Sequence, residues 1–152
     1  MKRVARMSIW VFLGASVLGM GLFGQGGTRH VVPSESMPTF ISPVGDLGFT
    51  ILLDQTSVGS DTALSLGTFL PGATVPEHTH QGSAEILYML NGAMEMTIGT
   101  RKMVARAGSA IYIPPDTPHS ATVLGKIEPV KVVQVYSPGG PEQRFKEWEP
   151  EG

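Results

Sequence analysis

The sequence predicts a single all-β domain, built as a sandwich or small barrel. Eight short segments rich in β-branched and aromatic residues follow one another, each bounded by Gly, Pro, Asn or Asp. Two of them are joined by Asn91-Gly92, a pair typical of a two-residue hairpin turn. No long amphipathic helix separates the segments, so strands at this spacing favour a sandwich or barrel over a parallel sheet.

The predicted strands place the barrel at residues 47–140. Before it, residues 28–46 carry Pro and Ser without clear periodicity and are expected to form an extended lead-in. After it, the tail 141–152 holds one stretch that could form a short helix, Glu142–Trp148, with two aromatic residues spaced to dock on the barrel. The expected strands are Leu47–Leu53, Thr62–Leu70, Ala84–Leu90, Ala93–Ile98, Lys102–Arg106, Ser109–Ile113, His119–Leu124 and Val130–Tyr136.

Composition excludes several classes of protein. The chain has 152 residues, of which 41% are hydrophobic and 16% are charged, and it contains no cysteine. A domain of this length can bury a sufficient core without cross-links. The lack of Cys excludes disulfide scaffolds and thiolate zinc sites. The formal net charge of -2 argues against an electrostatic nucleic-acid binder.

Residues 1–27 differ in character from the rest of the chain. Lys2, Arg3 and Arg6 precede Met7–Gly24, a stretch without a charged residue. A basic segment followed by an apolar one is typical of a secretory signal, so we expect the domain to be periplasmic or secreted. The alternative is an uncleaved membrane anchor formed by the same apolar stretch, although its length lies at the lower limit for a span.

Three histidines and one glutamate occur at spacings that can bring them together. One residue separates His78 from His80, so an extended segment would direct both imidazoles to one side. Glu85 follows after a turn, and His119 opens a strand directly after a proline-rich corner that restricts its backbone. A lone pair of histidines at this spacing is usually solvated. Together the four offer an N3O donor set that a divalent first-row metal accepts, with one or two positions left open.

The wider pattern resembles the two signature motifs of the cupin superfamily. They read Gly72-x5-His78-x-His80-x4-Glu85-x6-Gly92 and Gly108-x5-Pro114-x-Asp116-x2-His119, and the resemblance spans about residues 47–137. Asp116 stands where the family pattern often has Gly, and Val123 where it has Asn. Among cupins, the chain resembles the small single-domain bacterial members of the type-2 group that are similar to quercetin dioxygenase.

This resemblance implies a fold, a cofactor and a ligand set. The fold is a double-stranded β-helix, or jelly-roll barrel. The cofactor is one divalent transition metal, either Mn, Fe, Co, Ni, Cu or Zn, and the ligands are His78, His80, Glu85 and His119. In the dioxygenase-like members such a metal activates an enol or enolate toward dioxygen, which would make Glu85 both a ligand and the catalytic base.

Strand alternation predicts which side chains face the interior. If Glu85 points inward, Met89 on the same strand points inward too. On the next predicted strand, Met96 is expected to point inward. If Lys131 points outward, Gln134 and Tyr136 on its strand point inward. We expect Met89, Met96, Gln134 and Tyr136 to contact substrate. No Lys or Arg falls at a predicted inward position, which favours an apolar substrate that chelates the metal through oxygen. The same apolar residues could equally be ordinary barrel core.

The leading functional hypothesis is therefore a metal-dependent dioxygenase-type oxidoreductase acting on a small apolar molecule. A metal-dependent isomerase or lyase of a small keto or sugar compound is the alternative, and a non-catalytic exported binding domain is a third, because nothing outside the metal motif looks catalytic. Ile86, Tyr88 and Leu90 lie on the face opposite Glu85. This face needs a cover, either N-terminal strands or a second subunit, so a homodimer is also expected.

Overall fold

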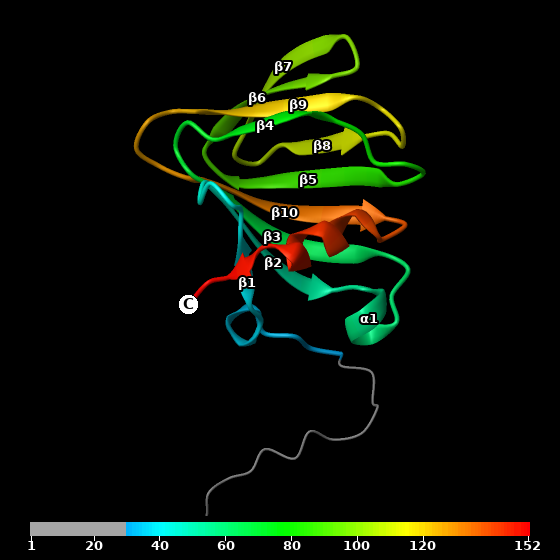
Figure 1. Ribbon diagram of the computed structural model, residues 1–152. Helices are drawn as coiled ribbons and strands as arrows, with labels where there is room; N and C mark the ends of the chain where they lie inside the picture. The colour runs from blue at the N-terminus through cyan, green and yellow to red at the C-terminus, as the bar shows by residue number, and fades with distance from the viewer. Residues whose placement is uncertain (1–29) are drawn as a thin grey trace, which may run out of the picture.

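The computed structural model describes residues 30–152, which form two antiparallel sheets (Figure 1). The predicted signal or anchor at residues 1–27 lies outside the described residues. Within them, no helix is long and apolar enough to cross a membrane. The larger sheet has seven strands and the smaller has four, and buried side chains from both sheets form one core cluster. The architecture is the β-sandwich form of a jelly roll.

The strands of each sheet are neighbours in an order that differs from their order in the chain. The larger sheet runs β11 (Glu149–Pro150), β1 (Thr39–Ile41), β2 (Leu47–Leu53), β3 (Ala63–Phe69), β10 (Val130–Ser137), β5 (Ala84–Asn91) and β8 (Ala110–Ile113). The smaller sheet runs β4 (Thr74–His78), β9 (His119–Leu124), β6 (Ala93–Ile98) and β7 (Arg101–Arg106). Three short helices complete the described fold: η1 (Ser34–Ser36), α1 (Gln55–Val58) and η2 (Pro141–Glu147).

All eight predicted strands are present, with ends shifted by at most one residue, and three further strands were not predicted. Strands β1 and β11 are too short to show a pattern, yet they extend the larger sheet beyond residues 47–140 at both ends. Strand β4 contains Pro76, which removes a ladder donor and weakens the strand signal. This proline is tolerated because β4 is an edge strand.

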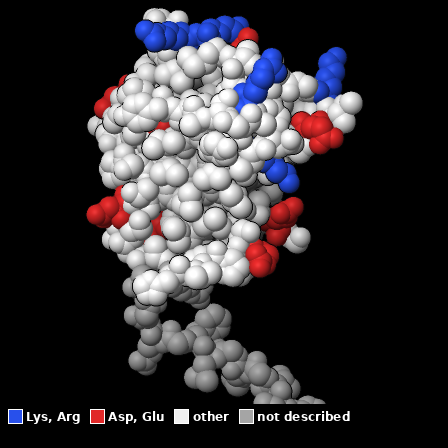
Figure 2. Space-filling view, turned by 180° about the vertical axis from the view of Figure 1, so that it is seen from behind, with Lys and Arg blue, Asp and Glu red and all other residues white. Residues whose placement is uncertain are grey.

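The predicted alternation is confirmed by burial. Leu87, Met89, Met94 and Met96 are buried, and so are Val132, Gln134 and Tyr136 on β10. In contrast, Ile86, Tyr88 and Leu90 on β5 are 39%, 47% and 50% exposed. The side of the molecule seen in Figure 2 carries its charged residues mainly near its margins. The homodimer that could cover an apolar outer face stays a prediction.

The tail contains a short helix of the 3-10 type, η2, that starts at a proline. Its aromatic docking is confirmed, since the Phe145 ring stacks on Phe49 at a centroid distance of 4.0 Å and Trp148 lies 5.1 Å from Phe145. A second anchor comes from Lys146, whose Nζ lies 2.7 Å from Oδ2 of the buried Asp54. The tail is therefore a fixed part of the barrel wall, at the front of the larger sheet (Figure 1).

Candidate metal centre

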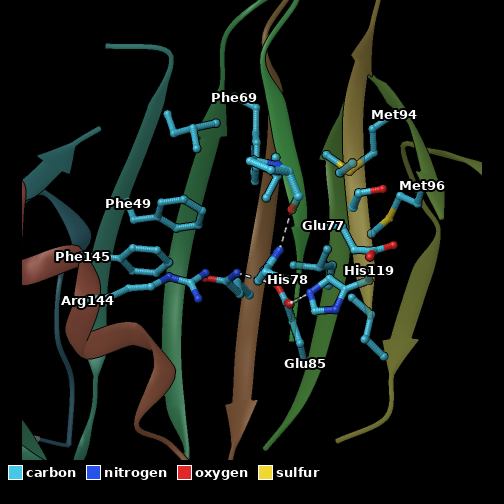
Figure 3. Close-up of a pocket in the computed structure, with 18 of the residues that line it drawn as sticks. Phe49, Phe69, Glu77, His78, Glu85, Met94, Met96, His119, Arg144 and Phe145 are labelled. Carbon is cyan, nitrogen blue, oxygen red and sulfur yellow. Dashed lines mark hydrogen bonds and ion pairs between the residues drawn. The ribbon is translucent and has the colours of Figure 1, made fainter. Parts of the chain in front are cut away.

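Four side chains converge between the two sheets. One potential ligand atom from each of His78, His80, Glu85 and His119 lies within 4.8 Å of the others. His78 ends β4 and pairs with His119 at the start of β9, while Glu85 projects from β5 of the opposite sheet. His80 lies in the turn between β4 and β5. Figure 3 shows His78, Glu85 and His119 meeting at one place.

Asp116 links the loop of His80 to the corner that precedes His119. Its backbone N–H donates to the carbonyl of His80 at 3.0 Å, and its Oδ1 accepts from the N–H of Gly82 at 3.1 Å. Its φ of 59° lies in the left-handed region, which explains why glycine is common in the family pattern here. Aspartate is among the residues that tolerate this conformation, so the departure from the pattern preserves the turn.

Backbone carbonyls orient two of the three imidazoles. Nδ1 of His78 lies 2.9 Å from the Pro76 carbonyl, and Nδ1 of His119 lies 2.8 Å from the Thr117 carbonyl. A carbonyl oxygen can only accept, so each Nδ1 carries the proton. In neutral imidazole the Nε2 lone pair then points into the cluster, which is the arrangement of metal-binding histidines in proteins.

Glu85 is a buried carboxylate held by three donors. Its Oε2 lies 3.0 Å from His80 Nε2 and 3.1 Å from His119 Nε2, and its Oε1 accepts from Gln134 Nε2 at 2.6 Å. Burial raises the pKa of this carboxyl, but the hydrogen bonds from His119, His80 and Gln134 together lower it by more than burial raises it. The pKa therefore lies well below its usual range. Glu85 is therefore ionised.

The donor set fits a cation. His119 has an acceptor at each ring nitrogen, so the metal-free ring must be an imidazolium to satisfy both. Burial lowers the pKa of His119, yet Glu85 and the Thr117 carbonyl raise it above 6.5. His78 differs, because burial lowers its pKa and keeps it neutral. A divalent transition metal would replace the His119 proton and bond to both Nε2 and the carboxylate, so these residues fit it.

A cavity of about 320 Å³ opens beside this cluster. Most of its wall is apolar, with Phe49 and Phe69 from one sheet and Met94 and Met96 from the other (Figure 3). The polar lining is His78, Glu85, His119, Ser120, Gln134, Glu77 and Arg144. The arrangement can hold a small, largely apolar molecule with an oxygen next to the cluster.

The structure separates the four residues expected to contact substrate. Met96 and Gln134 line the cavity, whereas Met89 and Tyr136 do not. Both are fully buried: Met89 belongs to the core, and the Tyr136 hydroxyl accepts from Gln134 Nε2 at 3.0 Å. Tyr136 also packs against the His80 ring, at 4.8 Å between centroids. Alternation gave their face but not their depth, so neither forms the cavity wall, and their contact with substrate stays a prediction.

The expectation of a cavity without a cation is wrong. Arg144 of η2 lines it, with Nη1 3.4 Å from His80 Nδ1 and Nη2 donating to the Tyr136 hydroxyl at 3.3 Å. Strand alternation could not reveal this residue, since it lies in the tail. The available signal was the aromatic docking pair, Phe145 and Trp148, because a segment docked on the barrel brings its neighbours to the same place.

Comparison with known proteins identifies the domain type. The family model for the cupin domain matches residues 65–136. The chain is 41% identical over 108 residues to the uncharacterized protein MJ1618 of Methanocaldococcus jannaschii, covering 70% of this chain and 86% of that protein. It is 30% identical over 100 residues to protein SchB of Streptomyces halstedii, covering 65% of this chain and 71% of that protein.

Solved structures share the fold at lower identity. KdgF from Halomonas superposes with a TM-score of 0.65 and 21% identity, covering 76% of this chain and 99% of that chain. A predicted oxalate decarboxylase from Thermotoga maritima gives a TM-score of 0.63 and 23% identity, and the superposition covers 72% of this chain and 99% of that chain. At these identities the likeness concerns the fold alone.

Proposed function

Because the chain belongs to the cupin superfamily, we propose that it binds one divalent transition metal through His78, His80, Glu85 and His119 and acts on a small oxygen-bearing substrate. The observation that carries this proposal is the cluster itself, with a buried carboxylate and three imidazoles at the wall of an apolar cavity. A bound metal would supply a Lewis acid at this wall. The metal remains one of Mn, Fe, Co, Ni, Cu or Zn.

The residues around the cluster perform separate tasks in this proposal. Two backbone carbonyls hold the imidazoles of His78 and His119 in the ligating tautomer. Gln134 fixes the carboxylate of Glu85 through Oε1. Glu85 is ionised, so its carboxylate can accept the proton of an enol held beside it. The apolar walls exclude water from that proton transfer.

Dioxygenase-type oxidation of an enol, flavonol or diketone is the leading reaction, supported by the apolar wall of the cavity. Arg144 gives specific support to a second candidate, an isomerase or lyase of a small keto compound, because it supplies the cation that the strands lack. A non-catalytic binding domain is the third outcome.

The test uses the purified protein loaded in turn with each of the six metals. We expect one metal ion per chain by elemental analysis and consumption of dioxygen when a flavonol or diketone is added. Turnover of a keto acid without dioxygen would support the second candidate. Metal-dependent binding of these compounds without turnover would support a binding domain, and absence of stoichiometric metal would contradict the whole proposal.

We also propose that residues 1–27 direct the domain out of the cytoplasm, with membrane anchoring through Met7–Gly24 as the alternative. The order of Lys2, Arg3 and Arg6 before an uncharged stretch supports this. A reporter that works only outside the cytoplasm, fused after residue 45, should be active. An inactive reporter contradicts export, and active reporter retained in the membrane fraction indicates the anchor.

A further inference from the structure

Arg144 is a cation on a mostly apolar wall. Of the Lys and Arg residues in the described part of the chain, it alone lines the cavity. The ion pairs of that part involve Lys102, Lys146 and two histidines, and no carboxylate lies within 4.0 Å of the Arg144 guanidinium. A partly buried guanidinium without a carboxylate partner is costly unless something neutralises it.

The neighbours of Arg144 orient it without supplying a negative charge to neutralise it. Its contacts to His80 Nδ1 and the Tyr136 hydroxyl are long, at 3.4 and 3.3 Å, and its guanidinium carbon lies 4.9 Å from the centre of the Phe145 ring. A guanidinium has five N–H donors, so several remain for a ligand. In Figure 3 the side chain of Arg144 extends from η2 toward the cluster.

Charge balance indicates what the cavity requires. A divalent metal would contribute two positive charges and Arg144 a third, while Glu85 and Glu77 contribute two negative charges among the lining residues. One positive charge is left over among the lining residues, since the buried Glu142 does not line the cavity and accepts from the Gly140 N–H and Gln143 Nε2. Gln134 adds a second polar requirement, because its Oε1 is buried and has no hydrogen-bond partner among the described residues. A ligand hydroxyl would satisfy that acceptor.

We propose that Arg144 binds the carboxylate of a ligand that has an apolar body and chelates the metal through hydroxyl or enol oxygens. This inference rests on the proposed metal function and assigns its substrate class, a hydroxylated or enolic organic acid. Arg144 is a positioning and specificity residue. It presents two parallel donors of the kind that carboxylates accept. The stacking of Phe145 on Phe49 and the ion pair of Lys146 with Asp54 fix η2 and hold the guanidinium in place.

Two probes that differ only in charge test the proposal. In 3,4-dihydroxybenzoate the catechol oxygens can chelate the metal and the ring carries a carboxylate, and 3,4-dihydroxybenzamide replaces that carboxylate by a neutral amide. Binding of both to the metal-loaded full chain is measured by calorimetry. We expect the carboxylate to bind roughly ten- to a hundredfold more tightly, the range of a hydrogen bond to a charged group.

Three variants locate the origin of that preference. Arg144→Gln should abolish the preference, with the metal still bound at saturating concentration, and Arg144→Lys should retain part of it. Arg101→Gln, which removes an exposed cation on β7, is the matched control and should behave like the unaltered protein.

The outcomes distinguish this inference from the proposed function. Metal-dependent binding of both probes with equal affinity, or a preference that survives in Arg144→Gln, overturns the role of Arg144 and leaves the metal site standing. Binding that does not depend on metal, or no binding of either probe, overturns both. Arg144→Lys provides a folded comparison if Arg144→Gln lowers the unfolding temperature.

Discussion

Two of the three buried carboxylates in the described residues, Glu85 and Asp54, accept hydrogen bonds from different kinds of donor. Asp54 is 1% exposed and accepts from Lys146 Nζ at 2.7 Å, Gln143 Nε2 at 2.9 Å and the Ser57 N–H at 2.7 Å. Its partner is a permanent cation. Glu85 is 5% exposed and faces two imidazoles and one amide, none of which carries a permanent charge.

This difference separates a structural carboxylate from one that we propose to bind a metal. Asp54 caps α1 and anchors η2, and its charge is neutralised within the fold. Glu85 is neutralised in the metal-free protein only when an imidazole takes up a proton. The fold supplies the cation at Asp54 but not at Glu85, which supports the proposed metal site at Glu85.

The largest expected effect is on metal affinity. Glu85→Gln removes the anionic ligand and should lower affinity by more than about a hundredfold, since even supporting residues cost ten- to a hundredfold. Asp54→Asn is the matched variant at the other carboxylate and should keep the metal. Elemental analysis and calorimetric titration measure both. Loss of metal in Asp54→Asn but not in Glu85→Gln would reverse the comparison.

The histidines extend the same test. His80→Ala and His119→Ala should each lower metal occupancy strongly, because the donor set falls to three. His30→Ala is the control, since His30 is exposed and lies outside the cluster. If His30→Ala removed the metal and His80→Ala did not, the ligand assignment would be wrong.

The second effect is on stability. Asp54→Asn should lower the free energy of unfolding by about 1 to 3 kcal/mol, the range for a hydrogen bond to a charged group. Burial raises the pKa of Asp54, but bonds from Lys146, Gln143 and Ser57 lower it below its usual 3.8. Because the folded pKa is the lower one, this contribution is complete above pH 3.8 and is lost as the pH falls below it.

Denaturant unfolding at several pH values measures this contribution. The unaltered protein should lose more stability than Asp54→Asn as the pH falls below 3.8. Identical acid dependence in the two proteins would show that the ion pair with Lys146 adds nothing in solution.

The third effect is the pH dependence of metal binding. The two sites differ here because the pKa of His119 is raised and the pKa of Asp54 is lowered, so they titrate in different pH ranges. The pKa of His119 is raised in the metal-free protein, because Glu85 and the Thr117 carbonyl favour its protonated form, so its proton competes with the metal as the pH is lowered. Affinity should fall as the pH is lowered through that raised pKa, with release of a proton on binding. Asp54→Asn should give the same profile, because Asp54 does not titrate in this range. Affinity that is constant between about pH 8 and pH 6 would contradict the role of His119.

The sequence predicts the cluster around Glu85 but not the ion pair of Asp54 with Lys146. Spacing and family resemblance predicted His78, His80, Glu85 and His119, because each lies in one of two short motifs with a local pattern. Asp54 and Lys146 are 92 residues apart and carry no local pattern, so only the folded chain reveals their pairing.

The same reasoning explains what was missed at the cavity. Alternation assigns a side chain to a face but not to a depth, so it does not distinguish Met89 and Tyr136 from the residues that line the cavity. Arg144 reaches the cavity from a 3-10 helix, which has no strand periodicity to mark an inward position. Strand β4 was missed because Pro76 interrupts its signal.

The smallest expected effect separates the two amides that hold the carboxylates. Gln134 donates to Glu85 at 2.6 Å and Gln143 donates to Asp54 at 2.9 Å. Gln134→Leu should lower metal affinity about tenfold, because Glu85 loses the bond that orients it, with the metal still bound at saturating concentration. Gln143→Leu should leave metal affinity unchanged and lower the unfolding free energy by about 1 kcal/mol, since Lys146 still neutralises Asp54. Calorimetry and denaturant unfolding on both variants measure the two effects, and equal metal affinity in the two would mean that the orientation of Glu85 does not depend on Gln134.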